Sequence, residues 1–382
     1  GNNIAIGCQA ALKLTSGNHN AFIGNNVAAN AATTGSYNFI FGKSGALSLT
    51  SGSCNIVLGG YSGGSCLSTG AKNVLLGNRV ASNGGAAFTG NSNLILGDQA
   101  GKKITTGSFN TFLGTYAGGT GVVTGQSNVA IGCKAGTNIT SGCYSVMIGL
   151  CAGAGFTTQK FNIAVGCKAL GSVTNSSSEK NIAIGAYAGQ HLDASGSGVS
   201  NVILIGHCAG YKSHGENGIA IGQGAAGSDN NKVACNGIAI GALAGRNLCG
   251  SHNISMGFCG GYGSGTVSNN TGSRNISMGC KAGASITSAI DSVLIGSQAG
   301  LNLTTGRYNV FVGRGAGYCN ANGACNVMIG SCAGKLNVSG QCNTFIGMHA
   351  GKNVTSGDKN IAIGSYVTLP SATGSCQLEV GY

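Results

Sequence analysis

The sequence is poor in charged residues and in proline, and both shortages restrict its class. Charged residues make up 7% of the 382 positions while 42% are hydrophobic, which excludes a chain kept disordered by high charge and low hydrophobicity. Glycine is abundant, with 72 residues, but proline occurs once, at Pro370, so the chain is no collagen triple helix. No apolar run reaches the ~18 residues of a membrane-spanning helix.

Acidic residues are also scarce. There are 8 of them against 20 basic residues, which gives a formal net charge of +12. The basic residues form no cluster and no aromatic stripe accompanies them, so we expect no nucleic-acid partner. A diffuse attraction to anionic surface glycans fits this charge better. The 17 cysteines include no C-x-x-C pair with zinc spacing, and we expect no structural metal.

One short motif, Asn-Ile-Ala-Ile-Gly, first occurs at Asn3 to Gly7 and repeats along the whole chain. Its closing glycine occurs 22 times, and of the 21 intervals 11 are 17 residues and three are 18. A period maintained in this way predicts a repeat architecture, in which each repeat contacts only its neighbours. We therefore expect one elongated domain over residues 1–382. Because the chain begins within a repeat and without methionine, we also expect it to be a window of a longer fibrous protein.

Each repeat consists of the same parts. The Asn-Ile-Ala-Ile segment is a short β-branched run bounded by glycine, which is typical of a strand. Ala-Gly begins three residues after the closing glycine, and a Thr/Ser-Thr/Ser-Gly turn follows after a variable linker. Glycines at fixed places allow sharp corners. The prediction is an all-β fold without helix, a parallel β-solenoid of about 22 rungs of 17–18 residues stacked at ~4.8 Å.

The asparagine that heads the strand predicts a ladder of stacked amides along the solenoid axis. It is present in 19 of the 22 copies, although Asn201, Asn217 and Asn236 come one position early. The spacing is irregular between Gly166 and Gly279, where we expect loops to bulge outward. The strand motif continues through this region, so we predict no domain boundary there.

The strands are apolar on both faces, which bears on assembly. We expect the first and third residues after the asparagine, such as Ile4 and Ile6, to fill the roll. The second residue then lies on the opposite face and needs a partner, because a bare apolar column of this length is unusual. We therefore predict a homo-oligomer whose interface contains Phe22, Ile40, Phe112, Met147, Phe311, Met328 and Phe345. Alternatively the column tolerates water, because many of its members are small or polar.

N-x-Ser/Thr sequons provide candidate glycosylation sites. Asn138, Asn302 and Asn353 each follow their repeat glycine by six residues, on the linker where a glycan could project. The further candidates are Asn337, Asn175 and Asn269. Two other sequons, at Asn253 and Asn275, lie in the predicted ladder and should be inaccessible.

Cysteine and histidine side chains are the candidates for a disulfide or for catalysis. Cys325 and Cys342 occupy one column in adjacent rungs, and their expected Cα separation of ~4.8 Å is within disulfide range. Cysteine is equally a small hydrophobe that suits a tight column. The six histidines share no column with the few acidic residues, and no phosphate-binding glycine loop opens a helix. We expect no enzyme and no cofactor.

The repeat Asn-Ile-Ala-Ile-Gly-x-x-Ala-Gly with its Thr-Thr-Gly turn resembles the β-roll head repeats of trimeric autotransporter adhesins. It also resembles related repeats in phage and giant-virus tail-fibre-like proteins. The resemblance covers the whole chain and implies a left-handed roll, three chains around one axis, and an extracellular fibre that binds surfaces. The repeats here are longer than the adhesin-head unit by the Thr-Thr-Gly segment, and the family's stalk, anchor and chaperone lie outside this sequence.

Three functions follow from these observations. We predict a structural extracellular fibre or filament protein, secreted or displayed on a cell or virion surface. It would associate with itself as a homotrimer or filament. The alternative is an adhesin or viral receptor-binding fibre that attaches to cell-surface glycans. A minor alternative is ice binding through the Thr/Ser column, although Phe88, Val123 and Val338 interrupt its first row.

Overall fold

The computed structural model describes residues 1–61, 63–82, 86–192, 198–212, 215–227, 236–263 and 270–381. These residues form 22 short strands and no helix. Each strand coincides with one copy of the sequence motif. The strands are β1 Ile4–Ile6, β2 Ala21–Ile23, β3 Phe39–Lys43, β4 Ile56–Tyr61, β5 Val74–Leu76, β6 Leu94–Leu96, β7 Thr111–Leu113, β8 Val129–Ile131, β9 Val146–Ile148, β10 Ile163–Val165, β11 Ile182–Ile184, β12 Ile203–Ile205, β13 Ile219–Ile221, β14 Ile238–Ile240, β15 Ile254–Met256, β16 Ile276–Met278, β17 Val293–Ile295, β18 Val310–Val312, β19 Val327–Ile329, β20 Thr344–Ile346, β21 Ile361–Ile363 and β22 Leu378–Val380.

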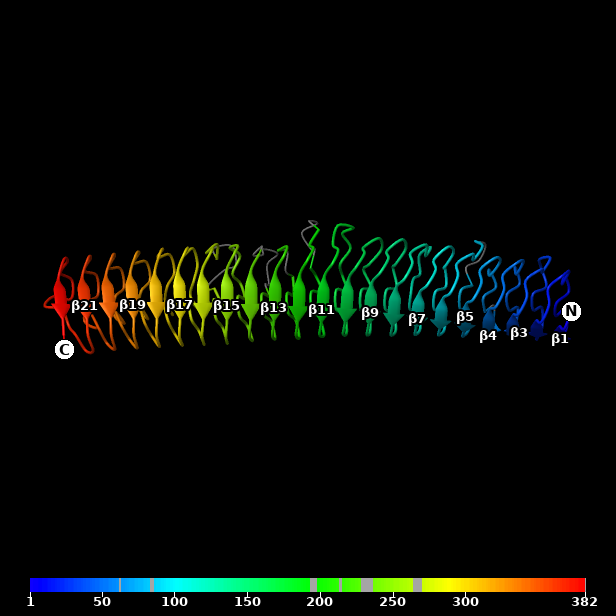
Figure 1. Cartoon of the computed structure of the whole chain (residues 1–382), viewed down its shortest axis with the longest axis horizontal. Coiled ribbons are helices and arrows are strands. Elements are labelled where there is room, and N and C mark those ends of the chain that lie inside the picture. The colour runs from blue at the N-terminus through cyan, green and yellow to red at the C-terminus, as the bar shows by residue number, and fades with distance from the viewer. Residues whose placement is uncertain are drawn as a thin grey trace. The chain divides into compact units, whose positions relative to one another are not determined.

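The chain divides into two compact units, Gly1–Gln190 with strands β1 to β11 and His191–Tyr382 with strands β12 to β22. Within each unit, successive strands pair in parallel and lie side by side, one per coil (Figure 1). The predicted parallel β-solenoid is therefore confirmed. A single continuous domain and a left-handed coil stay predictions.

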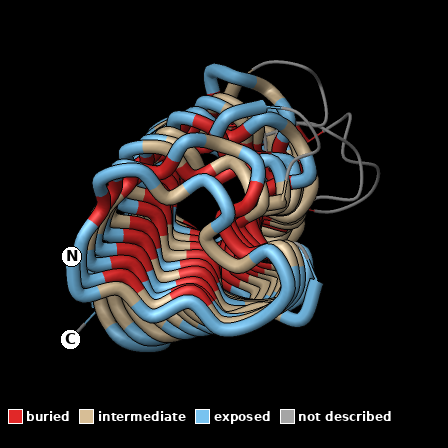
Figure 2. The backbone as a smooth tube through the Cα atoms, turned by 90° about the vertical axis from the view of Figure 1, so that its right-hand side faces the viewer, coloured by how far each residue is buried: buried red, intermediate tan, exposed pale blue. Residues whose placement is uncertain are grey.

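The strands stack in register, so that equivalent residues of the repeat form columns. In the first unit Ala5 pairs with Phe22, and Phe22 with Ile40. In the second unit Phe311 pairs in the same way with Met328. Figure 2 shows the result as rows of buried positions that recur from coil to coil. A substitution at one repeat position therefore changes the contacts with the equivalent residues of the two adjacent coils.

The repeat glycine is required at the corner that ends each strand. Gly114 has a φ of +133°, in a region that residues with a side chain rarely adopt. A Cβ atom at this position would lie 2.7 Å from the carbonyl oxygen of Gly132 in the next rung. Both the backbone conformation and the close approach of successive coils thus exclude a side chain.

The asparagine ladder is present and does more than stack amides. The Oδ1 atom of Asn20 accepts hydrogen bonds from the backbone N–H and the Nδ2 atom of Asn38, at 2.9 and 3.0 Å. Asn38 Nδ2 also donates to the carbonyl of Gly52, at 2.9 Å, in the turn that precedes the next strand. Each asparagine therefore ties the start of one strand both to the preceding asparagine and to the following turn.

The middle residue of the strand fills the interior of the roll. It is buried in all twenty strands from β2 to β21, while the first and third residues are partly or largely exposed. The buried Ala of the Ala-Gly pair, for example Ala117, packs in the same interior. The core is therefore built from the middle residue, the ladder asparagine and this alanine, one set per coil.

This arrangement overturns the predicted interface. The side chains assigned to it have no solvent exposure within a single chain, so they are not available to a partner: Phe22, Ile40, Phe112, Met147, Phe311, Met328 and Phe345. Alternation along a strand fixes which residues share a face but not which face is inside. The ladder asparagine decides this, because its amide must be buried and the middle residue lies two positions later on the same face.

Candidate interaction surface

The first and third residues of the strands form two parallel rows on the outside of each unit, which we call the outer apolar face. None of the 44 side chains in these rows is charged, and all are apolar except Thr111 and Thr344. Ile163 and Ile329, in the middle of the rows, are 36% and 39% exposed. These rows were predicted to fill the interior, and the structure places them at the surface.

The size of the outer apolar face is considerable. Eleven strands spaced at ~4.8 Å and three residues wide at ~3.3 Å give about 500 Å² in each unit. A typical monomer has a largest apolar patch of about 300–600 Å². The outer apolar face of each unit is therefore as large as the largest apolar patch of a typical monomer, although it is smaller than the ~800 Å² that each partner contributes to a standard protein–protein interface.

One margin of this face is a column of residues in the left-handed conformation. It consists of the residue directly before the ladder position, and its φ is +57° at His19, +61° at Tyr37 and +59° at Cys54. A residue with a side chain adopts this conformation at a cost of about 1 kcal/mol. Asn201, Asn217 and Asn236 belong to this column and not to the ladder, with φ between +56° and +62°. Asparagine tolerates this conformation well, which explains their early position.

Side chains of the left-handed column stack on one another from rung to rung. The rings of His19 and Tyr37 lie 4.9 Å apart and those of Tyr144 and Phe161 5.3 Å apart, nearly parallel in both pairs. Because each ring covers one face of its neighbour, this column is a poor platform for stacking sugar rings.

Charges also pair within this column. Arg274 donates to both carboxylate oxygens of Asp291, at 2.7 and 2.8 Å. This hydrogen-bonded pair raises the pKa of Arg274 and lowers the pKa of Asp291. This ion pair neutralises part of the charge along this margin of the outer apolar face.

The glycosylation candidates differ in accessibility. Asn138 and Asn302 are exposed, whereas Asn353 is half-buried and hydrogen-bonded through both amide atoms to the backbone of Leu369. Asn175 is half-buried and accepts a hydrogen bond from the N–H of Ser177. Asn269 lies outside the described residues.

Asn337 is fully buried, and its assignment as a glycan carrier is wrong. It follows its repeat glycine by seven residues, at an interior position that Leu303 and Val354 occupy in other rungs. As expected for ladder residues, Asn253 and Asn275 are also buried. Glycosylation of Asn138 and Asn302 stays a prediction.

The described cysteines form no disulfide with one another, and their exposure follows their position. Seven are exposed, which we call the marginal cysteines: Cys8, Cys54, Cys133, Cys280, Cys325, Cys342 and Cys376. Cys325 and Cys342 are neighbours, and burial together with Cys342 raises the pKa of the Cys325 thiol. The disulfide predicted between these two residues stays a prediction.

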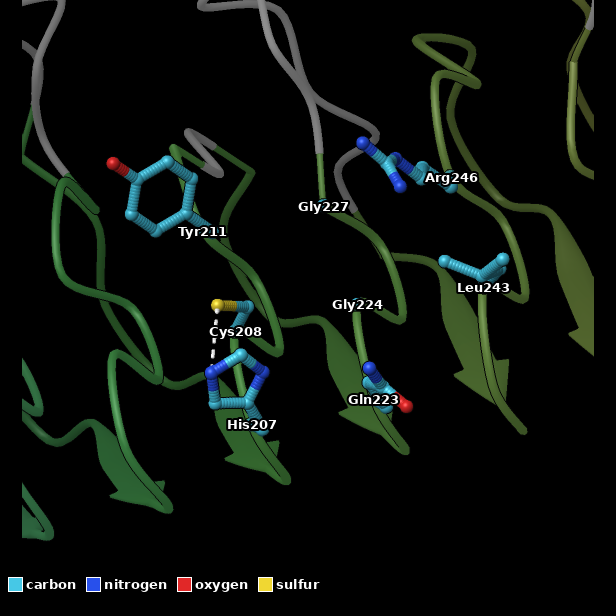
Figure 3. A pocket seen from close by; sticks show the side chains of 8 residues that line it. All are labelled: His207, Cys208, Tyr211, Gln223, Gly224, Gly227, Leu243 and Arg246. Atoms are coloured by element: carbon cyan, nitrogen blue, oxygen red, sulfur yellow. Dashed lines mark hydrogen bonds between the residues drawn. The ribbon is translucent and has the colours of Figure 1, made fainter.

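A hollow of about 250 Å³ lies on the second unit, lined by His207, Cys208, Tyr211, Gln223, Gly224, Gly227, Leu243 and Arg246 (Figure 3). It arises because Gly224 stands at the position that Cys208 and Leu243 occupy in the adjacent rungs. One side chain is therefore missing from the column.

The chemistry of this hollow is limited. The Nε2 atom of His207 lies 3.6 Å from the thiol sulfur of Cys208, a pair that resembles the start of a nucleophilic site. However, burial raises the pKa of Cys208 although the charge of Arg246 opposes this. The thiol therefore stays protonated near pH 7, and an activated thiolate is not provided. In the described part of the chain no three His, Cys, Asp or Glu side chains are placed to hold a metal ion.

No known family profile matches this chain, and no curated protein matches it either. The resemblance to adhesin-head and tail-fibre repeats therefore rests on the repeat motif alone, and the family stays a prediction. The solenoid fold that the resemblance implied is observed. Over the described residues, no helix has the length and hydropathy needed to cross a membrane.

Proposed function

We propose that the protein is a structural subunit of an extracellular fibre, and that its copies associate through the outer apolar face. The observation that carries this proposal is the absence of charge from the two outward rows of each unit, in a chain whose net charge is +12. The charges lie elsewhere on the coils, where they keep the assembly soluble. Burying partly exposed isoleucine and valine side chains supplies the stabilisation.

A second copy of the chain is the partner that fits this face. Its side chains recur at the rung spacing of ~4.8 Å, so a surface with the same period can interdigitate with it along its whole length. Repeated inter-rung hydrogen bonds, as at Asn20 and Asn38, also suit a stiff element.

The observations favour this function over ice binding. The first hydroxyls of the Thr/Ser column donate to backbone carbonyls of the next rung, from Thr15 to Thr33 at 3.0 Å and from Thr140 to Thr157 at 3.1 Å. They are therefore engaged with the protein and do not form a free hydroxyl ladder. A receptor-binding fibre is the other outcome of the experiment below, since imaging would then show short rods with one specialised end.

The proposal is tested by placing charges on the outer apolar face. The double variant Ile295→Asp/Ile329→Asp should dissociate the assembly, because each buried carboxylate would lose its hydration. Leu336→Asp/Val338→Asp is the matched control, since these residues are 47% and 45% exposed but lie on the linker and in the turn that follows it, outside the outer apolar face. Sedimentation analysis should show a reduced mass for the first variant and an unchanged mass for the second. Equal masses for both variants and the native chain would refute the proposal, and electron microscopy of native material should show long uniform filaments.

A further inference from the structure

The residues that directly follow the repeat glycines form another outer column, at the margin of the outer apolar face where the strands end. In the first unit this column carries cations and tyrosines one or two residues after the glycine. We call it the basic stripe, and its members are Lys43, Tyr61, Arg79, Tyr116, Lys134, Lys168 and Tyr187. In the sequence these residues are about one or more periods apart, so they form no cluster there. The structure brings them into one line.

Hydrogen bonds between coils hold the stripe together. The backbone N–H groups of Arg79, Lys134 and Lys168 donate to carbonyls of the preceding coil, at 2.9, 2.9 and 2.8 Å. Lys43 pairs with Tyr61 across strands β3 and β4. The members therefore recur at multiples of the rung spacing, and from β3 to β11 the stripe is ~38 Å long.

Lysine and tyrosine side chains of the stripe lie against one another. The Nζ atom of Lys43 donates to the phenol oxygen of Tyr61 at 2.9 Å and lies 4.5 Å from the centre of its ring. The hydrogen bond and the charge of Lys43, with a smaller contribution from Arg79, lower the pKa of Tyr61. The Nζ atom of Lys168 lies 5.7 Å from the ring centre of Tyr187. Ammonium and phenol groups thus present donors to the same ligand atoms.

The first unit is also the more positive one. It contains 10 basic and 2 acidic residues, whereas the second unit contains 10 and 6. The second position after the repeat glycine carries a single cation in the second unit, Lys281. One acid, Asp98, adjoins the stripe, and its carboxylate accepts hydrogen bonds from Asn78 and Gln99 at 3.1 and 3.2 Å. Positive charge is therefore concentrated along one side of the first unit.

We propose that the basic stripe binds an acidic polysaccharide that lies along the solenoid axis. Its carboxylate or sulfate groups contact the cations, and its hydroxyl groups contact the tyrosines. A single exposed ion pair is weak, so the affinity comes from several contacts made by one extended polymer. Such binding goes beyond the proposed function and does not depend on it, because the stripe lies on one chain and outside the outer apolar face.

The spacing of the cations favours a polysaccharide over a nucleic acid. They follow strands β3, β5, β8 and β10, so neighbouring cations are two or three rungs apart, at ~9.6 or ~14.4 Å. A DNA strand carries one phosphate per ~3.4 Å, and most of its charges would find no cation. A polysaccharide with an acidic group on alternate sugars has more widely spaced charges. The rings of Tyr61 and Tyr187 also carry an ammonium over one face, which limits base stacking.

Binding of labelled polymers to the full chain, measured by fluorescence anisotropy, tests the inference. The probes are a heparin fragment with sulfate and carboxylate groups, a hyaluronan fragment with carboxylate groups alone, neutral dextran and oligodeoxythymidine. We expect binding of an acidic fragment that weakens as salt is added, and no binding of dextran. The tighter of the two fragments identifies the anionic group. Binding of neither fragment, or tighter binding of oligodeoxythymidine, would overturn the inference.

Removal of the stripe cations should weaken this binding. The triple variant Arg79→Gln/Lys134→Gln/Lys168→Gln should bind the acidic fragment about tenfold more weakly, as expected for the loss of three exposed ion pairs. Glutamine fits these positions, since Gln99 stands in the same column. An unchanged circular dichroism spectrum shows that the fold is kept.

A matched control removes the same charge from the other side of the outer apolar face. Lys72→Gln/Lys160→Gln/Lys180→Gln changes three lysines that lie at or next to the left-handed column of the first unit. Its affinity for the fragment should stay within about twofold of the native value. Equal weakening in the two triple variants would show that binding follows net charge alone, and it would overturn the stripe as the site.

A gain of affinity provides a test that misfolding does not imitate. Asp98→Asn removes the acid beside the stripe and keeps an oxygen that accepts from Asn78. Asparagine fits there, since Asn25 and Asn78 also directly follow a repeat glycine. The variant should bind the acidic fragment about twofold more tightly. Weaker binding by a folded Asp98→Asn variant would contradict the proposed site.

Discussion

Two stretches of the second unit differ in regularity although they share one fold. From Gly279 to Gly381 every repeat has 17 residues, and the inner column contains Leu294, Phe311, Met328 and Phe345. From Gly206 to Gly279 the intervals are 16, 19, 16 and 22 residues, and the inner residues are Ala220, Ala239, Ser255 and Ser277. In the regular stretch four of the six middle strand residues are large and apolar, the other two being Ala362 and Glu379, whereas all four in the irregular stretch are small.

The ladder differs between these stretches as well. In the regular stretch Asn309, Asn326 and Asn343 are linked in succession. In the irregular stretch Gly218 and Gly237 occupy the ladder position, which removes the amides. Buried polar atoms without a hydrogen-bond partner occur in both stretches, at Asn247, Asn270 and Ser277 in the irregular one and at Asn320 and Asn337 in the regular one. The small inner residues and the gaps in the ladder, however, coincide with the irregular period.

The largest expected effect comes from the inner column. Phe311→Ala should lower the free energy of unfolding of its unit by about 3–5 kcal/mol, because a fully buried ring leaves a cavity. Ser277→Ala should instead raise it by about 1 kcal/mol, since the Oγ atom is buried without a partner. Denaturant unfolding of both variants measures the contrast. A Ser277→Ala variant as unstable as Phe311→Ala would contradict the assignment of an underfilled polar core to the irregular stretch.

Substitution of a corner glycine should have the next largest effect on stability. Gly296→Ala should destabilise the unit by at least ~1–3 kcal/mol from backbone strain. Its φ is +129°, and its Cβ would lie 2.6 Å from the carbonyl oxygen of Gly313. Gly315→Ala is the control, since its φ is +63° and its Cβ would meet only the Cys332 sulfur, at 3.6 Å. Thermal unfolding should separate the two variants clearly, and equal midpoints would contradict the close stacking of the corners.

Loss of a ladder asparagine should lower the free energy of unfolding by a smaller amount. Asn326→Ala removes the acceptor of the Asn343 N–H and the donor to the Gly340 carbonyl, at 3.0 and 2.8 Å. Unfolding should then become easier by about 2 kcal/mol, because buried polar groups lose their partners. Asn236→Ala, in the exposed left-handed column, should change stability much less. Amide hydrogen exchange checks this difference, and similar protection in both variants would argue against the ladder.

Glycosylation should not change stability measurably, but it tests which asparagines lie at the surface. In native protein, mass spectrometry should find glycan on Asn302, which is exposed, and none on Asn337, which is fully buried in the same regular stretch. A glycan on Asn337 would contradict the placement of the seventh residue after the glycine in the interior.

The period and the motif were sufficient to predict the fold. The 17-residue spacing, the β-branched strand and the corner glycines led to a parallel solenoid, and the asparagines led to the ladder. The assignment of faces was wrong, because Ile4 and Phe22 are both apolar and hydropathy does not distinguish them. The ladder asparagine distinguishes the two faces, because its amide must be buried and the middle residue, two positions later, lies on the same face.

Other features depended on packing that the period does not express. The left-handed column carries residues as different as His19, Tyr37 and Cys54, so no residue type marks it. The burial of Asn337 was missed because a polar residue stands at a position that is apolar in most rungs. The hollow beside His207 results from one glycine, Gly224, in a column of larger side chains.

The central claim is that the outer apolar face lies in water in a single chain and is covered by another copy in the assembly. The sequence contains no tryptophan, so Phe39→Trp places a single tryptophan, which can be excited selectively beside the 11 tyrosines, in the outer row at a residue that is 43% exposed. Acrylamide quenching should be strong at high dilution and should fall as the concentration rises and the copies associate. Strong quenching at all concentrations would show that the face stays in water, and protection in a proven monomer would show that the face is inside.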